Sequence, residues 1–209
     1  MNLGELKTEV FRRLNESASS PVFWSVADVE RAINDGQEEL ADATEFYERH
    51  TRIDLLSHRT YYDLRHICED TFIAPRRVYN NEISKWLDPS HVRDFDAIRQ
   101  RWETNTGQPM KWFMRGTWWL GLYPQPDADF GSIRFYYAAI PPELVEDEDA
   151  PQFPDEYHEA LIEYAIYDLE AQDAETDQAL VHYANYLGFE QRLKRYVDSR
   201  LSPDRVERH

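Results

Sequence analysis

Apolar residues recur every three or four positions at the start of the chain, which is the spacing of one face of an α-helix. Residues 2–15 carry this pattern through Leu3, Leu6, Val10 and Leu14. Polar residues fill the positions between them. The spacing therefore predicts a first amphipathic helix.

A second, longer helix is predicted after the turn-rich segment NESASSPVF. Ser25 is a favoured N-cap residue, and Asp28 supplies the acidic partner of a capping box three positions later. An apolar stripe follows, and the helix is predicted to extend to about Arg49. Gly36 interrupts this stripe, which indicates a close contact between helices.

The hydrophobic period then shortens toward two, and β-branched and aromatic residues become frequent, as is typical of strands. Asn80–Asn81 is predicted to form a hairpin turn, and the segment HVRDFDAIRQRW a short helix that ends at Trp102. The predicted strands cover residues 51–56, 60–65, 72–80, 82–88, 110–115, 117–124 and 132–141.

Helical spacing returns after an acidic linker. Pro154 suits the first turn of a helix, and Asp155 and Glu156 lie near the positive end of its dipole. A final helix is predicted over residues 177–201. Its predicted buried stripe consists of Leu180, Tyr183, Ala184, Leu187, Leu193 and Val197.

This order of elements predicts the fold class α+β, mainly α. The terminal helices are expected to form one helical bundle, from which a small antiparallel β insertion projects. The expected parts are the N-terminal helices over residues 1–50, the β-rich insertion over 51–141, the C-terminal helical hairpin over 142–201 and a flexible tail over 202–209.

Composition narrows the classes of function. Among 209 residues, 40 are Asp or Glu and 23 are Lys or Arg, a net charge of −17 that opposes non-specific binding to nucleic acid. Only four of the basic residues are lysines, which fits either a GC-rich genome or a saline cytoplasm. No apolar run approaches the ~18 residues that a bilayer span requires. Cys68 is alone, so an internal disulfide is excluded.

The best candidates for a catalytic or metal-binding site lie at the start of the penultimate predicted helix. Their spacing does not match the motifs that such sites require. His158–Glu159 begins like a zinc-protease helix, but Ile162 stands where the second histidine is required. Asp155 and His158 have the spacing of a carboxylate-bridged metal pair, but His182 in the next helix has no acidic residue three positions before it. No nucleophile turn or phosphate loop is present. We therefore expect no catalytic, metal or cofactor site.

Aromatic residues cluster in the predicted strands. Packing between strands is the simplest explanation, and a protein–protein surface, in which Trp, Tyr and Arg are enriched, is the alternative. The candidates for contact with other subunits or with the tail are Trp112, Phe113, Trp118 and Trp119. Arg76–Arg77, Arg99 and Arg101 are predicted to be solvated, and in a repeated assembly they would pair with a neighbour's carboxylates.

Five motifs follow one another along the chain. They are W-S-x-x-D-V-x-R-A-I-N-D-G-Q-x-E-L (24–40), Y-D-L (62–64), G-Q-P (107–109), L-x-L-Y-P-x-P (120–126) and F-P-D-E-Y-H-E-A-L-I-E-Y-A (153–165). In this order they resemble the head–tail adaptor, or connector, proteins of tailed bacteriophages and tailed archaeal viruses. The resemblance covers residues 1–200.

The resemblance implies a structural virion protein that is not an enzyme and needs no cofactor. Its implied partners are the portal protein, other copies of itself in a ring of about twelve, a downstream neck, head-completion or tail protein, and double-stranded DNA. That DNA passes through the lumen without sequence-specific binding. The implied location is the virion neck at the head–tail interface, after assembly in the host cytoplasm, with no membrane contact.

The resemblance also implies roles for two sets of residues. The C-terminal part is expected to dock on the portal, and an acidic linker near the lumen wall would repel DNA. The portal-docking candidates are Arg192, Arg195, Tyr196, Arg200, Leu201, Arg205 and Val206. The acidic channel or linker candidates are Glu146, Asp147, Glu148, Asp149, Asp155 and Glu159.

Two alternatives stay open at this point. The first is that the chain is a non-catalytic protein–protein interaction module from another assembly that shares the helix–sheet–helix order. The acidic linker has an equally simple explanation as an exposed segment that keeps the protein soluble.

Overall fold

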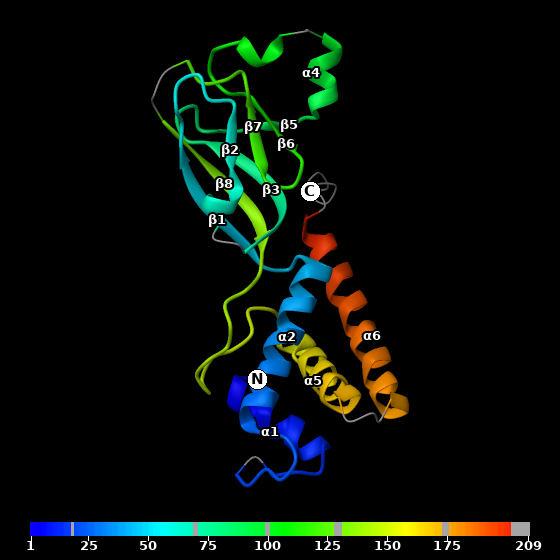
Figure 1. The fold of residues 1–209 in the computed structure, drawn as a ribbon. Coiled ribbons are helices and arrows are strands. Elements are labelled where there is room, and N and C mark those ends of the chain that lie inside the picture. The colour runs from blue at the N-terminus through cyan, green and yellow to red at the C-terminus, as the bar shows by residue number, and fades with distance from the viewer. Residues whose placement is uncertain (18, 69–70, 99–100, 128–130, 173–175, 202–209) are drawn as a thin grey trace, which may run out of the picture. The chain divides into compact units, whose positions relative to one another are not determined.

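A computed structural model describes residues 1–17, 19–68, 71–98, 101–127, 131–172 and 176–201. The chain divides into two compact units (Figure 1). The first, called here the helical unit, combines residues 1–47 with the segment from residue 140 onward. The second, the sheet unit, comprises residues 48–139.

The helical unit consists of helices from both ends of the chain. Its first two helices begin with capping boxes, Asn2 with Glu5 and Ser25 with Asp28, and the second of these confirms the prediction from sequence. The elements are α1 (Leu3–Arg13), α2 (Val26–Thr44), the 3-10 turn η2 (Asp155–Tyr157), α5 (Glu159–Gln172) and α6 (Thr176–Leu201).

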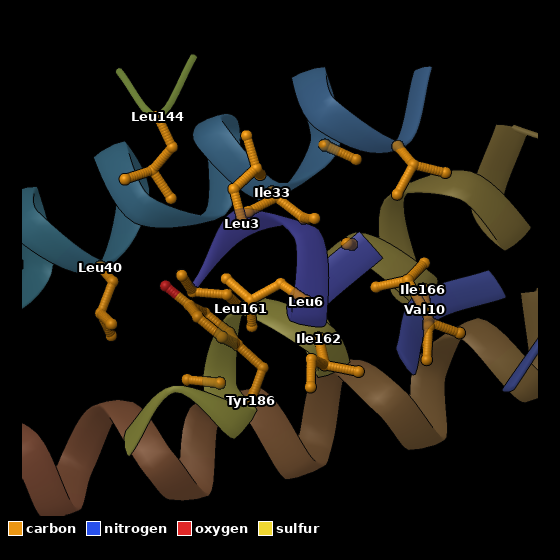
Figure 2. Packing of buried hydrophobic residues seen from close by; sticks show 14 of the residues in the cluster. Leu3, Leu6, Val10, Ile33, Leu40, Leu144, Leu161, Ile162, Ile166 and Tyr186 are labelled. Carbon is orange, nitrogen blue, oxygen red and sulfur yellow. The ribbon is translucent and has the colours of Figure 1, made fainter. Parts of the chain in front are cut away.

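One apolar core holds these helices together. Leucine, isoleucine and valine side chains from α1, α2 and α5 form one buried cluster with Tyr186 of α6, as Figure 2 shows. Gly36 on α2 marks the closest approach, since a Cβ atom there would lie 2.8 Å from Cδ1 of Tyr164 on α5. The predicted close contact between helices is therefore confirmed at Gly36.

The segment between the sheet unit and α5 is bound along the helices of its own unit. Asn34 on α2 donates to the Leu144 carbonyl at 3.0 Å and accepts from its N–H at 2.8 Å. Gln37 donates to the Pro142 carbonyl at 3.1 Å. Leu144 and Phe153 are buried in the helical core. The acidic linker is thus a structured strap and not a free connector.

The sheet unit contains two four-stranded sheets. The first has the order β1-β8-β3-β4 and the second the order β2-β7-β6-β5. The strands are β1 (Glu48–Asp54), β2 (Tyr61–Asp63), β3 (Phe72–Asn80), β4 (Lys85–Trp86), β5 (Asp88–Pro89), β6 (Lys111–Arg115), β7 (Trp119–Tyr123) and β8 (Ser132–Ala139). Short helical segments occur at α3 (Leu64–Ile67), α4 (Val92–Ile98) and η1 (Trp102–Thr104).

The two ends of the sheet unit lie side by side. β1 pairs antiparallel with β8, and this register places Glu48 opposite Ala138. The chain therefore enters and leaves the unit at the same edge of one strand pair. This geometry lets a large unit interrupt a helical unit without separating the halves of the helical core.

The predicted fold class, mainly α with a small antiparallel insertion, is wrong. Over the described residues the chain is about 45% helical and 23% strand, with six helices and two four-stranded sheets, which is a mixed α/β fold. β5 also pairs with β6 in parallel, so the second sheet is not purely antiparallel. The first sheet joins β1 to β8, which are more than seventy residues apart, and such pairing leaves no local signal in a sequence.

Two helical predictions also need correction. α2 ends at Thr44 and not near Arg49, because Glu45 adopts a left-handed conformation with φ of 53° and strand β1 follows. On α6, Leu180 was expected in the buried stripe but is 60% exposed. The small side chain of Ala179 is buried in its place.

The helix contact at Gly36 generates a stability prediction. Replacing Gly36 by Ala introduces a methyl group that overlaps Tyr164, and overpacking of this kind costs about 1–3 kcal/mol. Gly188 is the matched control, because it lies on α6 with open space around it, and Gly188→Ala should stabilise by about 0.5–1 kcal/mol. Urea unfolding followed by circular dichroism measures both changes, and equal midpoints for the two variants would contradict the close packing.

Candidate functional site

His158, the histidine at the start of α5, has a structural environment. Its side chain is buried, its Nε2–H donates to the Phe153 carbonyl at 2.9 Å, and its Nδ1 accepts from the Met1 amino group at 2.8 Å. Burial lowers the pKa of His158, so the fold holds the neutral ring. Among the described residues, no group of three or more His, Cys, Asp or Glu is placed to hold a metal ion.

Cys68 is buried as well. Burial raises the pKa of its thiol to about 11, which leaves very little of the nucleophilic thiolate at neutral pH. The side chain therefore has the character of a small packed residue.

The chain also contains no helix, within the ranges that the structure describes, that is long and apolar enough to cross a membrane.

Part of the acidic linker is engaged in its own fold. Asp147 forms an ion pair with Lys7 of α1 at 2.6 Å. Asp149 accepts two backbone N–H groups, from Val145 at 2.9 Å and Glu146 at 2.8 Å, and these bonds lower its pKa. Glu146 and Glu148 are exposed, and over the described residues their side chains form no hydrogen bond. Asp155 is also exposed, and its carboxylate lies 3.6 Å from the Met1 amino group.

The sixth acidic candidate, Glu159, belongs to a network centred on Arg13. The guanidinium of Arg13 contacts Glu159 at 2.5 Å and Glu163 at 2.8 Å. Glu163 is nearly buried and also accepts from His182 and Asn185 of α6, each at 2.9 Å. The network links α1, α5 and α6, so Glu159 has a structural role whether or not it faces a channel.

The net charge is divided very unequally between the two units. The helical unit contains 28 Asp and Glu against 10 Lys and Arg, a net charge of −18, whereas the sheet unit contains 12 against 13, a net charge of +1. The acidity of this protein is therefore a property of the helical unit. The sequence contained this signal, since counting charges over the predicted β-rich insertion, residues 51–141, also gives a net charge of +1.

The C-terminal half of α6 presents a local exception to that acidity. Arg192, Arg195 and Arg200 are exposed there, and Arg200 lies over the ring of the partly buried Tyr196 at 4.6 Å. The backbone of Leu201 ends the helix. Two further portal-docking candidates, Arg205 and Val206, lie outside the described residues.

The four aromatic contact candidates separate into two pairs. Phe113 is fully buried with its ring over Gly121 of the neighbouring strand, and Trp112 is 6% exposed. Both belong to the interior of the sheet unit, as the core-packing explanation anticipated. Trp118 is partly buried and Trp119 is 39% exposed, so these two remain the candidates for contact with a partner.

Sequence reasoning missed a surface on the first sheet. Side chains on β8 alternate, so that Ile133 and Phe135 are buried while Arg134 and Tyr136 project from the opposite face. Neighbouring strands add arginine and aromatic side chains to the same face through their register. This arginine–aromatic face consists of Arg52, Arg77, Tyr79, Trp86, Arg134 and Tyr136.

A comparison with protein families finds a match over nearly the whole chain. The model of the family described as SU10 adaptor protein matches residues 1–207, which includes both units. A comparison with curated proteins finds no match.

The environment of His158 generates a pH prediction. Since its folded-state pKa lies below the unfolded value, its contribution to stability is fully present above about pH 6.5 and is lost as the pH falls below that value. The free energy of unfolding should therefore fall less between pH 7.5 and 5.5 in His158→Gln than in the unmodified chain. His91→Gln, which changes an exposed side chain, controls for the loss of one histidine. Parallel pH profiles for His158→Gln and the unmodified chain would refute the structural role.

The charge division generates a salt prediction. Self-repulsion at −18 weakens the helical unit, and salt screens this repulsion. Between low and molar potassium chloride, hydrogen-exchange protection should increase more for the amides of α2 and α5 than for those of β3 and β8. An equal response in both units would show that the charge excess does not limit stability.

Proposed function

The chain belongs to the SU10 adaptor protein family, and we propose on that premise that it forms a ring below the portal vertex of a tailed virus. Members of this family are phage adaptors with a structural role in the virion, and their partners are among the portal and neck proteins. In the proposal, the ring extends the DNA channel of the portal and provides the platform on which the neck or tail attaches.

The observation that carries the proposal is the extent of the family match. Residues 1–207 include the helical unit, the inserted sheet unit and the end of α6. The match therefore concerns the whole molecule and not one module that adaptors share with other proteins.

Portal docking is proposed for the C-terminal end of α6. Three exposed guanidinium groups, those of Arg192, Arg195 and Arg200, project from a unit whose net charge is −18. A basic surface on an acidic unit favours one orientation toward an acidic partner, because the rest of the unit repels that partner. The proposed contact extends to Tyr196 and Leu201, and to Arg205 and Val206 beyond the described residues.

The exposed carboxylates of the linker are proposed to line the channel. Glu146, Glu148 and Asp155 project from a strap that is bound to α1 and α2, so their positions are set by the helical unit. Carboxylates on a channel wall repel the phosphate backbone and allow the genome to pass without being held. Asp147, Asp149 and Glu159 would contribute their charge while fulfilling the structural roles described above.

Attachment of the downstream protein is proposed to involve Trp118 and Trp119. Trp118 lies in the turn before β7 and Trp119 is the first residue of β7, and partly exposed aromatic side chains supply large contact area at low entropic cost. Trp112 and Phe113 would support that surface from the interior of the sheet unit.

Binding to the portal tests the proposal. The purified chain should be a monomer or small oligomer in sedimentation, and mixing with the portal ring of the same virus should yield a complex with a ring of adaptor below the portal. Arg192→Glu/Arg195→Glu/Arg200→Glu should weaken binding at least about tenfold, because each contact would become a like-charge contact. Arg93→Glu on α4 is the control for reversing an exposed arginine elsewhere.

Failure of the unmodified chain to bind the portal under assembly conditions would contradict the proposal. Unchanged binding by the triple variant would remove α6 from the portal contact while leaving the adaptor role intact.

A further inference from the structure

The arginine–aromatic face is built as a rigid, partly exposed surface. The Arg77 guanidinium lies 4.5 Å from the centroid of the Trp86 ring and 4.9 Å from that of Tyr136. Arg134 lies 4.8 Å from the centroid of Tyr79. Trp86 nevertheless remains 48% exposed. Arginine and aromatic side chains held against one another are enriched in protein interfaces, where arginine binds carboxylates.

The ion pairs within this face are weak and exchangeable. Arg52 contacts Asp54 at 3.1 Å and Arg77 contacts Glu48 at 3.3 Å, and both arginine side chains are more than half exposed. Exposed pairs of this kind contribute little to stability. Exchanging their carboxylates for those of a partner therefore costs the sheet unit little.

A complementary surface is present on the helical unit. Asp35, Glu38, Glu39 and Asp42 follow one face of α2, where with Ile140 and Tyr164 they line a hollow of about 330 Å³. Asp35 pairs with Arg31 on its own helix. Over the described residues, the other three carboxylates have no cation within ion-pair distance. The four residues are called here the α2 carboxylate row.

We propose that the arginine–aromatic face of one copy packs against the α2 carboxylate row of the next copy. The inference rests on the ring described under Proposed function and names the contact that would build it. Two different surfaces meet, so a row of copies always retains one free surface of each kind, one at either end. A contact of this heterologous type generates a closed ring when the rotation between copies closes.

The charge of the two units explains why this pairing is favoured over others. Two helical units at −18 repel each other, whereas a sheet unit at +1 that presents arginines meets a helical unit without that repulsion. Nucleic acid is the weaker alternative for the same face. Glu48 and Asp54 lie among its arginines, and the chain as a whole carries −17.

Disulfide trapping between copies tests the contact without the portal. His50→Cys places a thiol beside Tyr136 on the sheet face, and Glu38→Cys places one on the α2 carboxylate row. An equimolar mixture should form a disulfide-linked dimer at least about tenfold faster than either variant alone. The buried Cys68 does not compete, because its thiol pKa is raised to about 11.

Charge reversal then tests the chemistry of the contact. Arg52→Glu/Arg77→Glu added to His50→Cys, or Glu39→Lys/Asp42→Lys added to Glu38→Cys, should each slow trapping at least about tenfold. Mixing the two reversed chains should restore the rate, which also shows that both are folded. Glu146→Lys/Glu148→Lys, on the exposed linker, is the matched acidic control and should leave the rate unchanged. If Arg77→Glu disturbs folding, Arg77→Gln with Arg52→Glu replaces it.

Three results would overturn the inference. The first is a trapping rate for the mixture that is no higher than the rate for either variant alone. The second is a trapping rate that charge reversal does not lower, or that mixing the two reversed chains does not restore. The third is loss of binding to a short DNA duplex in Arg52→Glu/Arg77→Glu while trapping is unchanged, which would assign the face to nucleic acid. Portal binding by the unmodified chain, measured in parallel, separates this failure from failure of the adaptor role itself.

Discussion

The antiparallel pairing of β1 with β8 is the constraint on which the rest of the structure depends. It brings Glu48 and Ala138 side by side, so the sheet unit begins and ends at one place. Because the two ends meet, the helical unit is interrupted at a single point between residues 47 and 140. Helices from both ends of the chain can then share the core around Tyr186 (Figure 2). Without that pairing, the two ends of the sheet unit would not be held together, and the C-terminal helices would no longer be held close to the N-terminal helices.

The division of charge gives the two units different surfaces for contact with other molecules. The helical unit uses some carboxylates to hold itself together, as in the ion pair of Asp147 with Lys7 and in the Arg13 network, and it exposes many others. The sheet unit is nearly neutral and exposes stacked arginines. This protein thus combines an acidic helical unit with a nearly neutral sheet unit, which an acidic neighbour can approach more readily. The same residues that stabilise the monomer therefore limit which surfaces can meet in an assembly.

Local sequence determined the features whose causes are local. The capping box of Ser25 with Asp28 depends on residues three apart, and the strand over residues 72–80 depends on side-chain type and alternation. The contact made by Gly36 was also visible, because a glycine in an apolar stripe is rarely placed there without a neighbour. The succession of short motifs indicated the adaptor family, which the match over residues 1–207 confirms.

Tertiary structure decided the pairing of strands and the burial of individual side chains, because both depend on contacts between segments that are distant in the sequence. Strands near β1 and β8 were predicted, but their pairing across more than seventy residues, which builds a separate unit with two four-stranded sheets, was not, and this unit makes the fold mixed α/β. Leu180 is more hydrophobic than Ala179, yet the close packing of α6 selected the smaller side chain for burial. Trp112 and Trp119 look alike in sequence, yet the tertiary structure buries Trp112 and leaves Trp119 39% exposed. Register between strands likewise assembled Arg77, Trp86 and Tyr136 into one face, because a one-residue shift would have turned each side chain to the opposite side.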